Sequence, residues 1–212
     1  MNLYQALDEV FATRSQLRVL RALVGLPQGF PASTRELARR AGISHPTASA
    51  VLNSLADQGI ASKRVRSRLT LFQLNQGHVL VPRLRSLFEW ERDLPTSFVE
   101  FLRKQLGKHQ RYVLAAVLFG SAARNDMEAT SDVDLAVLVR EGQEVHALVV
   151  LEELEATLRT RFGNRLAPLV SSARSPEEWP DRPKIWRRVA EEGIPVIGGP
   201  PAVSHGKTRQ ER

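Results

Sequence analysis

The chain has 212 residues, and this length allows one large domain or two small ones. It contains no cysteine, which excludes disulfide bonds, thiolate chemistry and cysteine-ligated zinc and agrees with a reducing cytoplasm. Its formal net charge is +7, its first ten residues are unlike a signal peptide, and no apolar run reaches membrane-spanning length, so we expect a cytoplasmic protein without membrane attachment.

The positive charge is concentrated in the first half of the chain. Residues 1–93 contain 13 Lys and Arg against 7 Asp and Glu, whereas residues 94–212 contain 17 against 16. Such an asymmetry favours contact between the basic end of a chain and nucleic acid. The first half is therefore the candidate for a nucleic-acid-binding domain.

Two short helices are expected first. Ser15 can cap a helix whose leucines recur at helical spacing until Gly25-Leu26-Pro27. Ser33 or Thr34 opens a second helix that ends at Ala41, and Glu36 stands three residues after Ser33, the spacing of a capping box.

A third helix follows a tight turn at Gly42-Ile43-Ser44. Pro46 suits its first turn, and it extends to about Gln58 and ends at Gly59. The side chains expected to be buried are those of Ala48, Val51, Leu52 and Leu55. The side chains expected to face outward are those of His45, Thr47, Ser49 and Asn53. Two helices joined by a glycine turn are typical of a helix-turn-helix, whose second helix enters the major groove.

Two short strands, residues 60–65 and 69–74, complete this region as a basic hairpin. Residues 15–76 resemble the winged helix of bacterial transcriptional regulators. The resemblance implies that the third helix reads bases of double-stranded DNA and that the hairpin, or wing, contacts phosphates. The expected DNA-binding residues are Ser44, His45, Thr47, Ser49, Asn53, Lys63, Arg64, Arg66 and Arg68. A helical scaffold with a solvated basic hairpin, or a protein-docking module, is the alternative.

The boundary between the two halves is expected at residues 92–96. An amphipathic helix over residues 79–90 precedes it, with Leu80, Leu84, Leu87 and Phe88 on one face. Such a helix packs against the core, and in winged-helix regulators it often mediates dimerisation, so a homodimer is a hypothesis. Pro95 is expected to precede a new helix over residues 97–106. The predicted domains are 1–93, a winged helix with its trailing helix; 94–199, a second domain; and 200–212, a disordered tail.

Two apolar strand-like runs in the second half end or begin with polar residues. The run 113–119 stops at Gly120 and Ser121, and the run 133–139 begins between Asp132 and Asp134. Glycine lets the backbone approach a ligand, and a helical turn after Ser121 would aim its N–H groups at an anion.

The two aspartates can act together. Residues i and i+2 of a strand lie on one face about 7 Å apart, so both carboxylates can reach one hard cation. Mg²⁺ fits best, because it prefers oxygen ligands and commonly combines one or two carboxylates with substrate phosphates. A plain loop between two strands is the alternative.

In this order, Gly120, Ser121, Asp132 and Asp134 resemble the G-S-x10-D-x-D signature of the minimal nucleotidyltransferases of the DNA polymerase beta superfamily. Arg124 and Asp126 also match, and the resemblance covers about residues 95–199. It implies that Gly120 and Ser121 hold a nucleoside triphosphate such as ATP, with Arg124 on its γ-phosphate. It also implies that Asp132 and Asp134 bind Mg²⁺ and are catalytic, and that a nucleotidyl group passes to a hydroxyl acceptor. Many members are antitoxins, so a protein such as a cognate toxin is one expected acceptor.

One departure from the family leaves activity open. The family carries a third carboxylate in a later strand, but residues 165–171 contain no acid, and Pro168 stands at the expected position. Proline also indicates an edge strand or a bulge. The acids that could substitute are Glu152, Glu153, Glu155, Glu177, Glu178 and Asp181. An active nucleotidyltransferase and a transcriptional regulator with a degenerate, nucleotide-sensing or partner-binding domain, including an antitoxin that represses its own operon, are both compatible with the sequence.

The remaining elements alternate between helix and strand. A helix is expected over residues 144–162, ended by Gly163, followed by a strand over 166–171, a helix over 184–192 and a strand over 194–197. The expected fold is α/β (α+β), with an N-terminal winged helix-turn-helix and a C-terminal mixed sheet with flanking helices.

Overall fold

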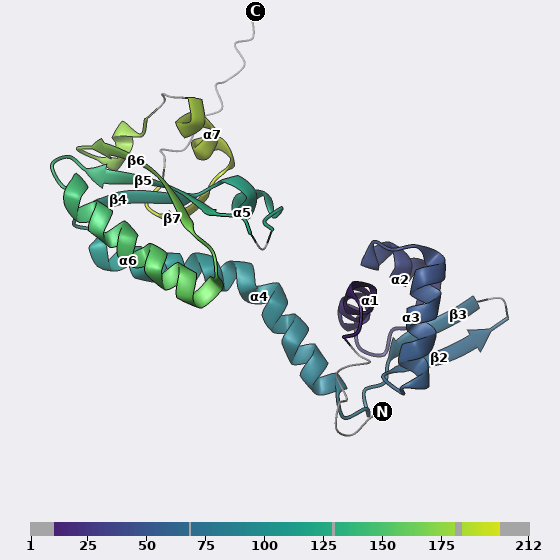
Figure 1. Cartoon of the computed structure of the whole chain (residues 1–212). Coiled ribbons are helices and arrows are strands. Elements are labelled where there is room, and N and C mark those ends of the chain that lie inside the picture. The colour runs from purple at the N-terminus through teal and green to yellow at the C-terminus, as the bar shows by residue number, and fades with distance from the viewer. Residues whose placement is uncertain (1–10, 68, 129, 181–183, 200–212) are drawn as a thin grey trace, which may run out of the picture. The chain divides into compact units, whose positions relative to one another are not determined.

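The chain folds into two compact units. The computed structural model describes residues 11–67, 69–128, 130–180 and 184–199. The units are residues 1–94 and 95–212, divided between Leu94 and Pro95 (Figure 1). Within the described residues, no helix combines the length and the apolar character needed to cross a bilayer.

The first unit is a small three-stranded sheet covered by helices. Its elements are α1 (Arg14–Val24), β1 (Ala32–Ser33), α2 (Thr34–Ala41), α3 (His45–Asp57), β2 (Ala61–Arg66) and β3 (Leu69–Leu74). The strand order is β1-β3-β2, and both pairs are antiparallel. Leu20, Leu37, Leu52 and Phe72 are almost completely buried in its core. The two-residue strand β1 was not predicted, because it has no hydrophobic pattern of its own and forms only by pairing with β3.

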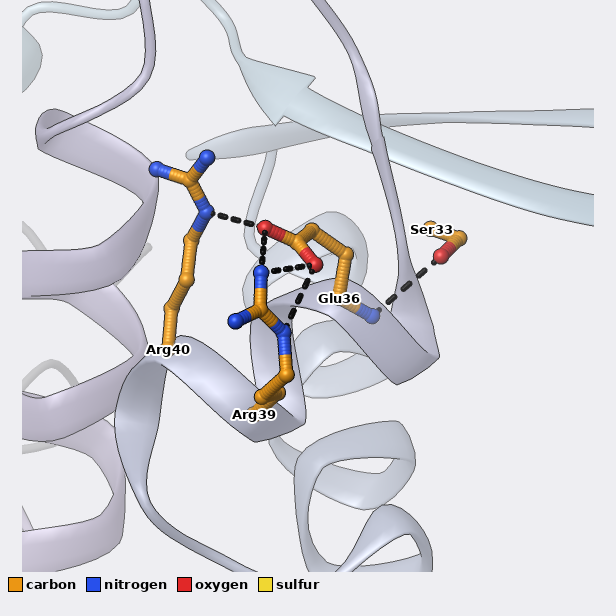
Figure 2. A network of polar contacts seen from close by, with 4 residues as sticks. All are labelled: Ser33, Glu36, Arg39 and Arg40. Atoms are coloured by element: carbon orange, nitrogen blue, oxygen red, sulfur yellow. Dashed lines mark hydrogen bonds and ion pairs between the residues drawn. The ribbon is translucent and has the colours of Figure 1, made fainter.

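The N-terminal caps of α1 and α2 differ in part from the predictions. Thr13, not Ser15, caps this helix, because Thr13 has an extended backbone and its hydroxyl accepts a hydrogen bond from Gln16 N at 3.1 Å. Ser33 caps α2 as predicted and accepts from Glu36 N at 3.2 Å. The second half of the predicted capping box is absent among the described residues, because the Glu36 carboxylate accepts hydrogen bonds from Arg39 and Arg40 of the same helix and not from Ser33 N (Figure 2). These two guanidinium groups hold the pKa of Glu36 below its ordinary value.

The predicted break at Pro95 is wrong, because one helix, α4 (Val81–Leu106), continues through it. Proline inside a helix removes one hydrogen bond and costs about 3 kcal/mol relative to alanine. Packing on both sides of Pro95 offsets this cost. Phe88 is buried in the core of the first unit, and Leu102 and Leu106 are buried in the core of the second. Leu87 is exposed, and the use of this helix in a homodimer stays a prediction.

The second unit is a four-stranded mixed sheet with helices on both faces. Its elements after α4 are η1 (Gly107–His109), β4 (Val113–Leu118), α5 (Gly120–Arg124), β5 (Val133–Arg140), α6 (Glu144–Phe162), β6 (Leu166–Ala173), η2 (Pro176–Glu178), α7 (Lys184–Glu192) and β7 (Ile194–Ile197). The strand order is β6-β5-β4-β7, with β5 and β6 parallel and the other pairs antiparallel. The predicted fold class is therefore confirmed.

The alternation of β5 assigns Asp134 to one face of this sheet. The odd-numbered residues Val133, Leu135, Val137 and Val139 pack with α6 and the end of α4. Asp134, Ala136 and Leu138 point to the other face, because successive side chains of a strand alternate. There Ala136 packs with Trp186 and Val189 of α7. Figure 1 shows α6 and the end of α4 below this sheet and α7 above it.

Both outer strands of this sheet contain a proline. Pro168 lies in β6 and pairs with Leu135, and Pro195 lies in β7 and pairs with Val117. Proline has no N–H to donate and is tolerated at the edge of a sheet. The edge position predicted from Pro168 is confirmed.

Candidate functional site

Gly120 and Asp134 are in direct contact where β4 and β5 end and begin. Phe119 N donates to Asp134 O at 3.0 Å, which joins the two strands at this point. Gly120 has φ +67°, a conformation that favours glycine. A Cβ at this position would collide with Asp134 Oδ2 and would lie 2.8 Å from its Cγ. Two features therefore require glycine at position 120: the left-handed backbone conformation and the close approach of the Asp134 carboxylate.

A pocket of about 300 Å³ opens at this contact. It is lined by Phe119, Gly120, Ser121, Ala123, Arg124, Asp134, Ile185, Arg188, Val189 and Glu192. The predicted residues Gly120, Ser121, Arg124 and Asp134 are thus brought together. Asp132 is exposed and does not line the pocket.

Asp132 and Asp134 nevertheless interact. Partial burial raises the pKa of Asp134, the charge of Asp132 raises it further, and the charge of Arg124 opposes both effects. A divalent cation between the two carboxylates would relieve their repulsion. No group of three His, Asp or Glu side chains in the described part of the chain could hold a metal. A Mg²⁺ ion would therefore need water and phosphate oxygens to complete its coordination, which is its usual preference.

The sequence predicts that Asp134 helps to hold a metal-nucleotide, and the raised pKa of this carboxyl gives that predicted binding a dependence on pH. A metal needs the ionised carboxylate, and the folded protein protonates Asp134 at a higher pH than an ordinary aspartate. As the pH falls, affinity for Mg·ATP should therefore begin to decline above the usual titration range of aspartate. Isothermal titration calorimetry across the acidic range measures this directly. A constant affinity down to the ordinary aspartate pKa would contradict it.

Arg124 is held by the acid two residues later. Its Nε donates to Asp126 Oδ2 at 3.2 Å, and both side chains are about half exposed. In the described residues, neither terminal amino group of Arg124 has a hydrogen-bond partner. The Arg124 guanidinium is therefore oriented at Nε, and its terminal amino groups are open to a ligand.

In the structure, the β6 residue that pairs with Asp134 is Ala167 and not Pro168, so a third carboxylate beside Asp134 would stand at Ala167. Paired residues of neighbouring strands point to the same face, and Asp134 pairs with Ala167, whereas Pro168 pairs with Leu135 on the other face. The β6 residues that share the face of Asp134 are Ala167, Leu169, Ser171 and Ala173. The expected position of the aspartate, Pro168, was thus wrong by one residue. Residues 165–171 contain no acid on either face of the sheet.

The acids suggested as substitutes lie elsewhere. Glu152, Glu153 and Glu155 belong to α6, which covers the opposite face of the sheet, and Glu177 and Glu178 do not line the pocket. Asp181 lies outside the described residues. The carboxylate that lines the pocket with Asp134 is that of Glu192 in α7, accompanied by Arg188. The sequence indicated that Arg188 and Glu192 share a helix face but gave no sign that this face covers Asp134.

In the first unit, a groove of about 450 Å³ lies between α3 and the wing strands. It is lined by Ser33, Thr34, Arg35, His45, Ser49, Asn53, Lys63, Leu69, Thr70 and Phe72. Four predicted DNA-binding residues, His45, Ser49, Asn53 and Lys63, are therefore brought together. Exposed Arg35, in the first turn of α2, was not among the predicted DNA-binding residues, which were taken from the third helix, its cap and the wing.

Other predicted DNA-binding residues have different positions. Ser44 caps α3, accepting from Thr47 N at 3.3 Å, and its hydroxyl lies 2.7 Å from that of Thr47. Arg64 and Arg66 are exposed on the face of β2 opposite to Lys63, since neighbouring residues of a strand alternate. Lys63 Nζ donates to Asn53 Oδ1 at 2.7 Å. Arg68 lies outside the described residues.

Comparisons with known proteins match the two units separately. Residues 13–68 match the model of the MarR family, and residues 103–168 match that of polymerase beta nucleotidyltransferases. The solved structure of MepR, a transcription regulator of the Staphylococcus aureus multidrug efflux pump MepA, is 23% identical, and the match covers 50% of this chain and 81% of MepR with a TM-score of 0.35. No curated protein sequence matches the chain significantly. The chain thus combines a MarR-like winged helix with a nucleotidyltransferase-like domain, as its two sets of motifs predict.

Proposed function

We propose that this chain is a DNA-binding transcription regulator whose second unit binds a nucleoside triphosphate with Mg²⁺ and uses it as a signal. One observation favours sensing of the nucleotide over its catalytic turnover. Asp134 lies in a pocket with Gly120, Ser121 and Arg124, while the neighbouring strand β6 has Ala167 beside it. Displacement with two metals needs the attacking and the leaving oxygen to be held, and two carboxylates supply less than the full set of ligands.

The DNA-binding part of the proposal is supported by the groove beside α3. Polar side chains of α3 and Lys63 of the wing line it, and Arg35 adds a second cation. Arg64 and Arg66 are exposed on the outer face of the wing. We expect the polar side chains of α3 to contact base edges and the cations to contact phosphates.

Replacing Arg64 and Arg66 by alanine should weaken DNA binding and make it less dependent on salt. Each lost phosphate contact should reduce the slope of log K against log salt by about 1, so the double variant should lose about 2. Fluorescence anisotropy with a mixed-sequence duplex at several salt concentrations measures the slope. The variant Arg83→Ala/Arg92→Ala removes the same charge from exposed positions of α4 and is the matched control. Equal slopes for the wild-type protein and the Arg64→Ala/Arg66→Ala variant would show that these arginines do not contact DNA phosphates.

The signalling part of the proposal is tested by coupling between the two ligands. Mg·ATP should change the DNA affinity of the wild-type protein, and Asp134→Asn should remove this change without altering DNA binding in the absence of nucleotide. Anisotropy titrations with and without Mg·ATP provide the comparison. Superimposable wild-type isotherms would eliminate nucleotide sensing.

Nucleotidyl transfer is the second candidate function, and the position of Glu192 favours it. Its carboxylate lines the pocket that contains Asp134 and could replace the acid absent from β6. In this reaction an acceptor hydroxyl, for example of a partner protein such as a cognate toxin, attacks the α-phosphorus. The bond to the β-phosphate oxygen breaks, pyrophosphate leaves and the hydroxyl proton passes to a base. Pyrophosphate release together with label from [α-³²P]ATP on an acceptor would establish transfer, whereas nucleotide binding without either product supports sensing alone.

A further inference from the structure

Helix α7 is anchored over the face of the sheet from which Asp134 projects. Trp186 and Val189 pack against Val117 and Ala136. The ring of Trp179 meets that of Trp186 edge to face, and Trp179 Nε1 donates to Trp186 O at 3.2 Å. These contacts fix the exposed side of the helix as one wall of the pocket.

Gly193, directly after α7, permits a close approach to the sheet. A Cβ at this position would collide with Val117 Cγ1 and would lie 2.5 Å from Val189 O. Any larger residue would push the end of α7 away from β4. The pocket wall formed by Ile185, Arg188, Val189 and Glu192 is therefore held close to Asp134 by the backbone as well as by the tryptophans.

Arg188 of α7 has the same hydrogen-bond arrangement as Arg124 of α5, which lines the same pocket. Its Nε donates to Glu192 Oε2 at 3.2 Å, as the Nε of Arg124 donates to Asp126 at 3.2 Å. Both terminal amino groups of Arg188 lack a hydrogen-bond partner within the ranges that the structure describes. A guanidinium that is held at Nε and open at its outer end can donate two parallel hydrogen bonds to a phosphate.

We propose that Arg188 is a phosphate-binding residue that contacts the polyphosphate of the nucleotide from α7, while Arg124 lines the same pocket from α5. The proposal rests on the proposed binding of a nucleoside triphosphate in this pocket. A triphosphate with one Mg²⁺ keeps an excess of negative charge. The pocket lining supplies two cations, Arg124 and Arg188, and each is already oriented by an acid. Arg188 should therefore increase the affinity for nucleotides with several phosphates relative to a nucleoside monophosphate.

The neighbouring arginine provides a matched control. Arg187 precedes Arg188 on α7 and is exposed, but it does not line the pocket. Arg188→Gln should weaken Mg·ATP binding roughly 10-fold or more, the loss expected for a hydrogen bond between charged groups. It should change AMP affinity by less than about twofold, because AMP has only the phosphate attached to the nucleoside. Arg187→Gln should leave both affinities at the wild-type values.

Isothermal titration calorimetry with Mg·ATP, Mg·tripolyphosphate and AMP on the full chain separates the outcomes. Arg188 is exposed, and equal melting temperatures of the two variants exclude a folding defect as the cause. If wild type binds Mg·ATP and both glutamine variants bind it equally well or equally poorly, the role of Arg188 is overturned while the proposed nucleotide site stands. If wild type binds neither Mg·ATP nor Mg·tripolyphosphate, the proposed function and this inference fail together.

Discussion

Replacing Asp134 by asparagine is expected to abolish the Mg²⁺-dependent part of the stabilisation of this protein by Mg·ATP while raising the melting temperature of the nucleotide-free protein. A ligand present at 100 times its dissociation constant stabilises the folded state by about 2.7 kcal/mol. Without the Asp134 carboxylate, a Mg²⁺ ion retains only Asp132 from the proposed pair. The Mg²⁺-dependent part of the shift should therefore disappear.

The gain without nucleotide follows from the pKa of Asp134. Burial and the charge of Asp132 raise this pKa in the folded protein, so the ionised side chain is less favourable there than in the unfolded chain. The resulting loss of stability is absent below the ordinary aspartate pKa and grows as the pH rises through the raised value. Asparagine has no charge, so its benefit should appear at neutral pH and vanish in acid.

Differential scanning fluorimetry with ATP, Mg²⁺ and both together tests the two effects at once. Glu153→Gln is a suitable control, because it makes the same carboxylate-to-amide change at an exposed position of α6 on the opposite face of the sheet. It should leave both melting temperatures near the wild-type values. An undiminished Mg·ATP shift in Asp134→Asn would exclude this carboxylate from the metal site.

Replacing Gly120 by alanine is expected to destabilise the second unit and to prevent nucleotide binding. A left-handed backbone costs a residue with a Cβ about 1–2 kcal/mol. The new Cβ would also collide with Asp134 Oδ2, so the carboxylate or the strand must move. We expect a total loss of roughly 2–4 kcal/mol, since displacement of a packed group adds to the strain.

A variant at Gly142 separates the backbone strain from the collision with Asp134. Gly142 has φ +78°, and a Cβ there would meet nothing within 4 Å. Gly142→Ala therefore carries the backbone strain without a collision and should keep Mg·ATP binding. Chemical denaturation gives the free energy of unfolding, and calorimetry gives the affinity. Equal destabilisation of the two variants, with nucleotide binding retained in both, would show that the contact between Gly120 and Asp134 has no functional consequence.

Short-range signals made much of both units predictable from the sequence. Ser33 caps α2, and Gly42 and Gly163 end their helices in left-handed conformations, because these effects depend on residues within one turn. The grouping of Gly120, Ser121 and Asp134 also followed from the sequence, since each lies at the end or the start of a strand and the two strands are neighbours.

Features that depend on distant residues could not be predicted in this way. Pro95 suggested a break, but α4 continues because its two halves are buried in cores whose other residues lie far away in the sequence. The position of the family's third carboxylate was expected at Pro168, but Ala167 is the residue that pairs with Asp134, since the register of β6 is set by pairing and not by its own pattern. Arg188 and Glu192 lie more than 50 residues after Asp134 in the chain and reach its pocket only through the packing of α7.

The prolines in the two outer strands of the second sheet limit how this protein can associate with other chains. An exposed strand edge is a template for pairing with a further strand, in a dimer or in an aggregate. Pro168 and Pro195 each remove one donor from such an edge. A strand added to β6 or β7 would meet an interrupted ladder, so both edges oppose growth of the sheet.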